Sequence, residues 1–349
     1  MTHEHETYSS VDLIVWSGTG NTRRVAEQIA GAARTLGATA RVLAGITVDD
    51  KQSSGSRLLG FLAPTHGFTA PWPLWKAALT TPGVRGTDVF VLVTRGGTRV
   101  AGKLFSGFEG TATYLPAAIL ALRGARIRGV GAIDMPLNWT VVHSAFDDES
   151  VAAIVARGDE RADDFAQKIL HGEKVFGGLI QLVLGLAILP LSLGYMLIAR
   201  LMLAKMFFAD ENCTSCGTCE SICPQGAVRL RGKSKRPYWS FHCQNCMRCM
   251  SNCPTNAIQG GQSWMVLYIW MTGLPIGALA AGAALDAMDM PAGFARSLID
   301  ALSGYAWTVG SVWIAYMLLW IGLTIPGVRF VLSKTTFTRF YRRYRGPEV

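Results

Sequence analysis

Apolar and polar positions give the two halves of the chain different characters. In the first half, short apolar runs that end at Gly-, Pro- or hydroxyl-rich turns read as buried strands. They cover residues 11–16, 40–44, 58–63, 88–94 and 126–132. Stretches with helical apolar spacing or helix-rich composition lie between or after them, at residues 23–36, 73–79, 111–122 and 145–170. This alternation predicts an α/β fold with a doubly wound parallel sheet, in which ligands bind outside the carboxyl ends of the strands.

The second half contains three apolar runs without a charged residue, each long enough to span a bilayer. They cover residues 175–199, 264–285 and 305–325. A buried core helix is the alternative for each run, but aromatic residues flank the last two as in membrane anchors. The composition favours a membrane protein, because 50% of the 349 residues are hydrophobic and only 16% are charged. We therefore predict transmembrane helices at 264–285 and 305–325.

The formal net charge of +9 is unevenly distributed. Basic residues gather before the second apolar run and after the third, at Arg229, Arg231, Lys233, Lys235, Arg236, Arg329, Lys334, Arg339, Arg342, Arg343 and Arg345. The loop between these runs carries Asp286, Asp289 and Asp300 against Arg296. The positive-inside rule then places both basic segments in the cytoplasm. Basic segments also bind nucleic acid, but one that directly follows an apolar run favours the membrane surface.

A glycine- and hydroxyl-rich loop joins the first predicted strand to the first predicted helix. Its residues are Ser17, Gly18, Thr19, Gly20, Asn21 and Thr22. Loop N–H groups, hydroxyls and a helix N-terminus together bind phosphate without a lysine. A Walker loop would need Gly-Lys-Ser/Thr, and a dinucleotide fingerprint would need a third glycine where Arg23 stands. The loop matches Ser/Thr-x-Thr-Gly-x-Thr, the phosphate loop of flavodoxins, in full; a plain strand-to-helix turn is the remaining alternative.

All eight cysteines lie in two runs of identical spacing. They are Cys213-x2-Cys216-x2-Cys219-x3-Cys223-Pro224 and Cys243-x2-Cys246-x2-Cys249-x3-Cys253-Pro254. This is the spacing of bacterial two-cluster ferredoxins, in which the fourth cysteine of each run ligates the other cluster. One [4Fe–4S] cluster is therefore assigned to Cys213, Cys216, Cys219 and Cys253. The second is assigned to Cys243, Cys246, Cys249 and Cys223.

Zinc sites and disulfides are the alternatives for these cysteines. Structural zinc sites take cysteines in pairs rather than in triplets with a distant fourth. Disulfides need an oxidising compartment, and the polar first ten residues contain no apolar core of a signal peptide. The two runs therefore predict iron–sulfur clusters.

Two known domains resemble parts of this chain. Residues 10–172 resemble a flavodoxin, and residues 205–262 resemble a 2[4Fe–4S] ferredoxin, a small α+β domain. Their order, with Met135-Pro136-Leu137-Asn138 closing the first, resembles the flavodoxin–ferredoxin fusion proteins of bacteria and archaea. This resemblance implies that the flavin is FMN, with its phosphate on the loop described above.

The resemblance also implies two loops that flank the isoalloxazine ring of FMN. Their residues are Pro64, Thr65, His66, Gly67 and Phe68 in one loop, and Thr94, Arg95, Gly96 and Gly97, with Thr98, in the other. Phe68, Trp72 and His66 are the candidates to stack on the ring, and the sequence does not choose among them.

The first apolar run, 175–199, raises a question of topology. A full crossing would place the flavodoxin domain outside, opposite the ferredoxin, although electron tunnelling decays steeply with distance. The run contains Gly185, Pro190 and Gly194, so we expect it to dip into the membrane and return, or to lie in the interface. Both domains would then face the cytoplasm from the inner membrane. The predicted domains are 1–172 flavodoxin-like, 173–204 membrane-embedded linker, 205–262 ferredoxin, 263–328 transmembrane hairpin and 329–349 basic cytoplasmic tail.

Together these parts predict a membrane-bound electron-transfer protein that passes electrons between FMN and two [4Fe–4S] clusters. We assign no catalytic residue. No second nucleotide motif is visible, so the expected partners are an upstream reductase and a membrane-associated acceptor enzyme, with membrane lipid and no nucleic acid. Two alternatives stay open: a self-contained reductase of membrane quinone, and a redox sensor or assembly scaffold.

Overall fold

The computed structural model describes residues 8–44, 56–344 and 346. The polar residues 1–7 and Arg345 of the basic tail lie outside the described residues. Two compact units make up the structure. Of the described residues, the first contains those up to 139, residues 144–193, Tyr344 and Gly346, and the second contains residues 140–143 and 194–343.

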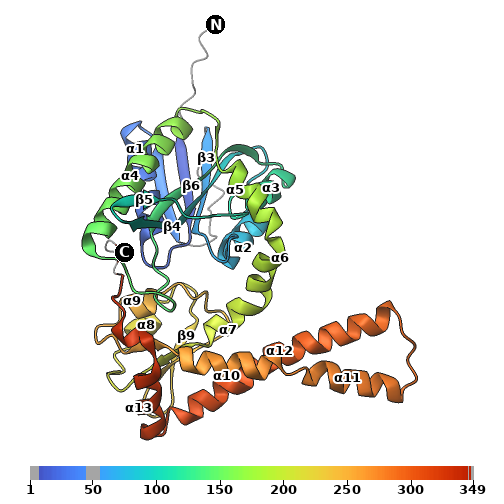
Figure 1. Ribbon diagram of the computed structural model, residues 1–349. Helices are drawn as coiled ribbons and strands as arrows, with labels where there is room; N and C mark the ends of the chain where they lie inside the picture. Colours follow the sequence, from blue (N-terminus) through green and yellow to red (C-terminus); the bar gives the residue numbers. More distant parts are fainter. Residues whose placement is uncertain (1–7, 45–55, 345, 347–349) are drawn as a thin grey trace. The chain divides into compact units, whose positions relative to one another are not determined.

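A parallel sheet forms the centre of the first unit (Figure 1). Its main strands are β1 (Ser10–Val15), β2 (Thr39–Ala44), β3 (Arg57–Pro64), β4 (Asp88–Val100) and β6 (Arg126–Pro136). They lie in the order β2-β1-β3-β4-β6, and β7 (Val175–Phe176) extends the sheet beyond β6. β5 (Lys103–Phe105) pairs antiparallel with the end of β4. This is the flavodoxin-like doubly wound order, in which the chain reverses direction across the sheet between β1 and β3.

Helices cover both faces of this sheet (Figure 1). α1 (Asn21–Thr35) packs with α4 (Asp148–Leu170), and α2 (Trp72–Thr80) packs with α3 (Tyr114–Leu122). The central strands are apolar on both sides because both faces are covered. Leu13, Ile29 and Phe90 are fully buried in the core on the α1–α4 side. This framework fixes the carboxyl ends of β1, β3 and β4.

Two segments of the first unit differ from the sequence-based expectation. Residues 94–98 are not a loop, because β4 continues to Val100 and pairs with β6 from Thr94↔Ile133 to Gly97↔Pro136. The Gly96-Gly97 pair suggested a turn, but Gly96 serves close packing: a Cβ there would lie 2.6 Å from Leu137 Cδ1. Val175 and Phe176, expected at the start of an apolar membrane run, are instead paired with Gly129 and Val130 in the sheet.

The second unit contains a small α+β domain built from two similar halves. Its elements are β8 (Phe207–Ala209), α8 (Thr218–Ser221), β9 (Val228–Arg231), β10 (Arg236–Trp239), α9 (Arg248–Ser251) and β11 (Ile258–Gly260). β8 pairs antiparallel with β11, and β9 pairs antiparallel with β10. Each short helix follows a loop that contains cysteines.

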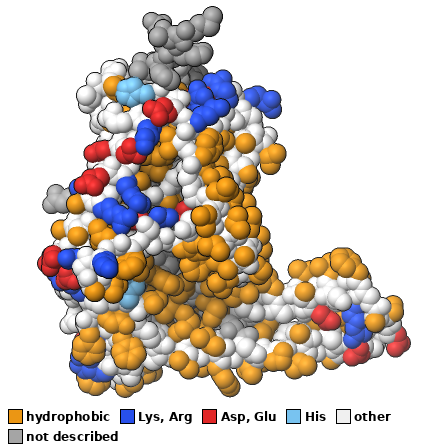
Figure 2. Space-filling model, turned by 45° about the horizontal axis from the view of Figure 1, so that its top comes forward, with side chains coloured by type: hydrophobic (Ala, Val, Ile, Leu, Met, Phe, Trp, Pro, Cys, Tyr) orange, Lys and Arg blue, Asp and Glu red, His pale blue; other side chains and the backbone are white. Residues whose placement is uncertain are grey.

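Apolar helices follow the small domain in the chain. They are α10 (Gln262–Gly273), α11 (Ile276–Ala287), α12 (Phe294–Gly322) and α13 (Pro326–Thr335), followed by a 3-10 turn, η2 (Phe337–Phe340). Among the described residues, two stretches are long and apolar enough to cross a membrane, Gln262–Ala287 and Phe294–Gly322. Figure 2 shows apolar side chains along the projecting helical pair of α11 and α12, with charged side chains gathered at its far end.

Apolar helices also precede the small domain. α5 (Leu179–Ala187) and α6 (Leu189–Gly194) are followed by a π-helical turn, η1 (Tyr195–Ala199), and by α7 (Arg200–Ala204). The segment is bent by 73° between Leu179–Ala187 and Leu189–Ala204, so it is either a broken span or a re-entrant loop. The break falls at Ile188, just before Pro190, which lies in the first turn of α6.

Candidate functional site

The predicted phosphate loop lies between the carboxyl end of β1 and the start of α1. Gly20, immediately before the helix, has φ 104°, a left-handed conformation that favours glycine. The Thr22 hydroxyl lies 2.8 Å from the Thr94 hydroxyl at the centre of the sheet. Asn21 Nδ2 donates to the carbonyl of Pro136, at 3.1 Å. These contacts tie the loop to β4 and β6, so two of the three segments expected around a flavin are in contact through Thr22 and Thr94.

The loop has the chemistry of an anion site. N–H groups in the first turn of a helix have no partner within the helix, and the helix dipole favours negative charge there. No acidic residue lies in the first turn of α1 to compete for these donors. Asn138, from the segment after β6, donates its amide to the Thr19 hydroxyl. The geometry fits a phosphate group held mainly by backbone N–H groups.

The loop after β3 presents the aromatic candidates. Phe68 has a positive φ of 61° and is 39% exposed, and its ring lies 5.5 Å from that of Phe108. His66 instead packs edge-on against Trp16, with ring centroids 5.3 Å apart. Desolvation lowers the pKa of His66 to about 4, so its ring is neutral at physiological pH. Trp72, at the start of α2, is 45% exposed. Phe68 and Trp72 thus have open ring surface, whereas His66 is packed.

Glycine allows the neighbouring loop to approach Phe68 closely. Thr111 donates its N–H to the Phe68 carbonyl at 3.1 Å. A Cβ at Gly110 would lie 2.3 Å from the same oxygen, and Gly110 also has a positive φ of 56°. The loop containing Phe68 is therefore fixed by the segment that precedes α3.

Arg95, predicted beside the flavin, uses its side chain for a buried ion-pair network. Its Nε lies 2.8 Å from Asp134 Oδ1, and its Nη1 contacts Glu109 Oε2. The side chains of Arg95, Asp134 and Glu109 are only 10%, 3% and 2% exposed. Burial alone would raise the pKa of Asp134, but Arg95 outweighs it and holds this pKa below its usual value. Only the backbone of this segment remains to face a bound ring.

The two cysteine runs repeat the same backbone conformation, thirty positions apart in the sequence. Three left-handed positions of the first run have left-handed counterparts in the second. They are Ser215 and Asn245 (φ 57° and 52°), Gly217 and Met247 (φ 82° and 62°), and Gly226 and Asn256 (φ 55° and 51°). The repeat is therefore structural and not only a repeat of cysteine spacing.

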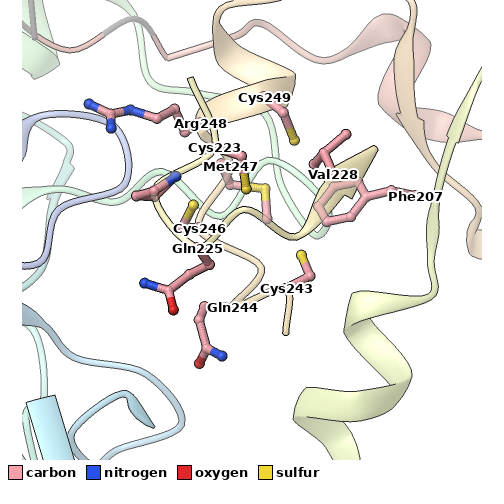
Figure 3. A pocket seen from close by; sticks show the side chains of 11 residues that line it. Phe207, Cys223, Gln225, Val228, Cys243, Gln244, Cys246, Met247, Arg248 and Cys249 are labelled. Atoms are coloured by element: carbon pink, nitrogen blue, oxygen red, sulfur yellow. The ribbon is translucent and has the colours of Figure 1, made fainter. Parts of the chain in front are cut away.

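The cysteines separate into two sets, each drawn from both runs. Cys223, Cys243, Cys246 and Cys249 line one pocket together with Phe207 and Val228 (Figure 3). Burial, together with the neighbouring thiols of Cys213, Cys253 and Cys216, raises the pKa of the Cys219 thiol to about 11. Cys223 of the first run thus lies with three cysteines of the second run, and Cys253 of the second run is among the neighbours of Cys219.

A single metal ion and a [4Fe–4S] cluster need different arrangements of their cysteine ligands. Among the described residues, no three His, Cys, Asp or Glu side chains converge on a point where a single ion would be held. A [4Fe–4S] cube is larger, because each cysteine binds a different iron at a corner. Thiolates spread around a pocket fit that requirement, and zinc would need them to converge tetrahedrally.

Backbone N–H groups point at the cysteine sulfurs. Ala227 N lies 3.2 Å from Cys223 Sγ, and Ala257 N lies 3.2 Å from Cys253 Sγ at the equivalent position. Asn245 N lies 3.4 Å from Cys243 Sγ. Such donors stabilise negative charge on sulfur and adjust the potential of a bound cluster. Burial raises the pKa of Cys243 to about 12, so binding of iron must displace a proton there.

The two cysteine sets differ in exposure. Cys216 of the first set is exposed, Cys213 and Cys219 are half-buried and Cys253 is buried. In the second set, Cys243 and Cys249 are buried, Cys223 and Cys246 are half-buried, and none is exposed. Solvent therefore has easier access to the set that contains Cys216.

A buried lysine connects the cluster domain to the apolar helices. Lys205 is 1% exposed, and its Nζ donates to the Trp239 carbonyl. The ammonium group lies 4.2–4.6 Å from the ring centroids of Tyr238, Phe241 and Tyr316. Tyr316, on α12, also accepts a hydrogen bond from Trp239 N at 3.0 Å. The long apolar helix is thus packed directly into the small domain.

Several residues around these sites were not among the sequence-predicted site residues. Asn138 belongs to a recognised element but was not assigned a contact, and Trp16 was placed only in a buried strand. Phe108 and Lys205 were given no role. Tyr344, whose hydroxyl donates to Asn21 Oδ1, is 323 positions away in the sequence, so no local pattern identifies it.

Comparisons with known proteins found one family match and several similar solved structures. Residues 205–255 match the family described as a 4Fe-4S dicluster domain. Among solved structures, the chain is similar to a two-electron reduced flavodoxin from Megasphaera elsdenii, with 21% identity over 45% of this chain and 98% of that chain and a TM-score of 0.29. No curated protein matches the chain.

Two further solved structures are similar to part of this chain. One is a flavodoxin from the domain Archaea, with 15% identity over 46% of this chain and 98% of that chain and a TM-score of 0.30. The other is rubredoxin oxygen:oxidoreductase from the anaerobe Desulfovibrio gigas, with 15% identity, a TM-score of 0.32, and coverage of 48% of this chain and 36% of that chain. The fold assignment itself rests on the strand order.

The chain therefore combines a flavodoxin-like α/β unit with a ferredoxin-type 4Fe-4S domain. These two kinds of domain indicate electron transfer with a flavin and iron–sulfur chemistry.

Proposed function

We propose that this chain is a membrane-bound electron-transfer protein that carries FMN and two [4Fe–4S] clusters and exchanges electrons with a partner redox protein. The observation that supports this most strongly is the division of the eight cysteines into two sets of four in a chain with a flavodoxin-like unit. FMN exchanges one or two electrons and each cluster exchanges one, so the cofactors link two-electron to one-electron chemistry.

The protein's part in this chemistry is to bind and orient the cofactors. The loop from Ser17 to Thr22 would hold the FMN phosphate. The loop from Pro64 to Phe68 and the backbone of Thr94, Arg95, Gly96 and Gly97 would flank the ring. Phe68 and Trp72 offer the exposed aromatic surface for stacking.

The cluster ligands follow from the two cysteine sets. Cys213, Cys216, Cys219 and Cys253 would hold one cluster, and Cys223, Cys243, Cys246 and Cys249 would hold the other. Backbone N–H groups from Ala227 and Ala257 approach Cys223 and Cys253, the crossed ligands of the two sets. Each crossed ligand also joins the two halves of the domain, so loss of one cluster should loosen both loops.

Membrane attachment through α10–α12 is supported by their exposed apolar surface. Trp270 is 63% exposed, Leu279 66% and Ile321 57%, a pattern that is costly in water and favourable in lipid. Asp286 lies in the last turn of α11 and Asp289 lies just after it, whereas the basic residues Arg329 and Lys334 lie on α13. The positive-inside rule then favours the cytoplasmic face of the inner membrane for the cluster domain.

The first apolar segment would enter the interface without crossing. α5 packs on the first unit through Gly185, where a Cβ would lie 2.6 Å from the backbone of Gly110. Its other face exposes Leu179, Ile180 and Val183, at 64%, 75% and 61%. A helix that packs on the α/β unit with one face and exposes apolar side chains on the other can lie in the membrane interface. A cysteine placed at Leu189 should resist membrane-impermeant thiol labelling from the periplasm; strong labelling would show a full crossing.

Redox titration of isolated membranes, followed by EPR, tests the main proposal. We expect about eight irons and one FMN per chain, and EPR signals from two distinct [4Fe–4S] clusters. A chain with flavin but without clusters, or the reverse, would refute the relay. The same sample, mildly solubilised, would identify the partner. Oxidation of the reduced clusters by an added quinone analogue alone would point to a quinone reductase instead.

A further inference from the structure

The phosphate loop of the first unit is contacted by a segment from the far end of the chain. Tyr344 belongs to the first unit and is 4% exposed. Its hydroxyl donates to Asn21 Oδ1, and Asn21 is the first residue of α1. Two positions later, Gly346 approaches the loop so closely that a Cβ there would lie 1.9 Å from the Thr19 carbonyl oxygen. This segment therefore packs directly on the loop.

Asn21 is fixed from both sides by these contacts. Its amide nitrogen donates to the Pro136 carbonyl at 3.1 Å, while its amide oxygen accepts from Tyr344. The side chain is therefore occupied by protein partners and is not available as a ligand for phosphate. Its backbone N–H, by contrast, lies in the first turn of α1, where it has no partner within the helix.

The Tyr344 hydroxyl is suited to this role. Burial raises the pKa of Tyr344 to about 12, so the group remains a neutral donor at physiological pH and adds no negative charge near a bound phosphate. Without this donor the Asn21 amide oxygen would lose its partner, and the side chain would be held only through its amide nitrogen on the Pro136 carbonyl.

We propose that Tyr344 is a positioning residue for the phosphate loop, which holds Asn21 and thereby the N–H groups that would bind the phosphate of FMN. This inference rests on the proposed binding of FMN. It extends that proposal by making the segment after the apolar helices a component of the flavin site, with a selective effect on the phosphate end of the ligand.

The test compares FMN with riboflavin, which has the same ring and no phosphate. The full-length protein, in detergent and stripped of flavin, is titrated with each ligand and followed by flavin fluorescence. Tyr344→Phe removes only the hydroxyl. Tyr341→Phe is the matched control, because its hydroxyl lies 3.4 Å from the Val142 carbonyl in the second unit.

We expect Tyr344→Phe to weaken FMN binding about 5- to 10-fold, the effect of one lost hydrogen bond. Riboflavin binding and iron content should stay unchanged, and Tyr341→Phe should affect neither flavin. In an Asn21→Ala background, Tyr344→Phe should have no further effect, because the two residues act through one contact.

Three results would overturn the inference. An equal loss of FMN and riboflavin would show a merely structural role. Unchanged or tighter FMN binding would show that the segment is irrelevant to the phosphate or competes with it. Full additivity with Asn21→Ala would show that Tyr344 acts elsewhere. If the wild-type protein binds neither flavin, the proposed function itself fails, and this inference fails with it.

Discussion

Replacing Arg95 by Met would show how much the buried ion-pair network stabilises the flavodoxin-like unit. The change leaves Glu109 without the cation that contacts it, in a site where its side chain is only 2% exposed. Asp134 keeps a second partner, Arg161, at 3.0 Å. Breaking a buried pair from one side costs about 3–5 kcal/mol, and the remaining Arg161 contact favours the lower figure, about 3 kcal/mol.

For a unit of this size, each kcal/mol corresponds to about 2–4 °C, so we expect the melting temperature to fall by about 6–12 °C. Release of bound flavin on heating, followed by fluorescence, reports the melting of this unit separately from the rest of the chain. The Asp134 pKa is lowered in the folded state, so its share of the stabilisation is fully present above about pH 4. This share is lost as the pH falls through the lowered pKa of Asp134. The difference in melting temperature between the wild-type protein and Arg95→Met should therefore narrow only at acidic pH.

The same strand supplies the control. Arg99 pairs with Glu149 at 2.8 Å, but Glu149 is 80% exposed, so solvent screens the pair and Arg99→Met should leave the melting temperature nearly unchanged. Adding Glu109→Gln to Arg95→Met should recover part of the loss, because no uncompensated carboxylate then remains at that position. A loss below about 2 °C for Arg95→Met, or no recovery in the double variant, would refute the reasoning.

The remaining predictions concern the clusters and the sheet. Cys223→Ala should lower the iron content from about eight to about four per chain, and the surviving iron should be removed quickly by a chelator, because it lies in the set that contains the exposed Cys216. Cys253→Ala should instead leave the cluster of the more buried set, whose iron a chelator removes slowly. If the iron left in Cys223→Ala were removed more slowly than the iron left in Cys253→Ala, crossed ligation would be contradicted. In the unchanged protein, ferricyanide should therefore release iron in two phases of about equal size; a single phase would show that exposure does not separate the sets. Gly60→Ala should destabilise the first unit by about 1–3 kcal/mol in thermal melts, because the new Cβ would lie 2.4 Å from Phe90 Cζ; an unchanged melting temperature would mean that Phe90 moves aside without cost.

Patterns that are local in sequence predicted the α/β fold. The strands of a parallel sheet covered on both faces are continuous apolar runs, so residues 11–16 and 58–63 could be recognised without knowledge of their neighbours. The order of those strands completes the doubly wound fold. The expected loop at 94–98 was wrong because Gly96 and Gly97 resemble a turn, whereas in the structure both lie in β4 and Gly96 allows Leu137 to pack closely against it.

Interactions between distant parts of the chain could not be predicted in the same way. Cysteine spacing is an exception, because the spacing alone indicates which cysteine belongs to which set. The sequence around Lys205 and Tyr344 does not indicate which residues they contact. Each is an isolated polar residue whose role depends on groups that only folding brings near, such as Tyr316 for Lys205 and Asn21 for Tyr344.

The position of Tyr344 in the chain also has a consequence for biosynthesis. A ribosome reaches residue 344 only after it has made both cysteine runs and all the apolar helices, because these precede it in the sequence. The sheet of the first unit is made early and domains fold as units during synthesis, but its phosphate loop gains Tyr344 much later. The first unit would then reach its full affinity for the flavin only after the downstream segments have been made. Tight flavin binding would therefore be limited to chains whose apolar helices have already been translated.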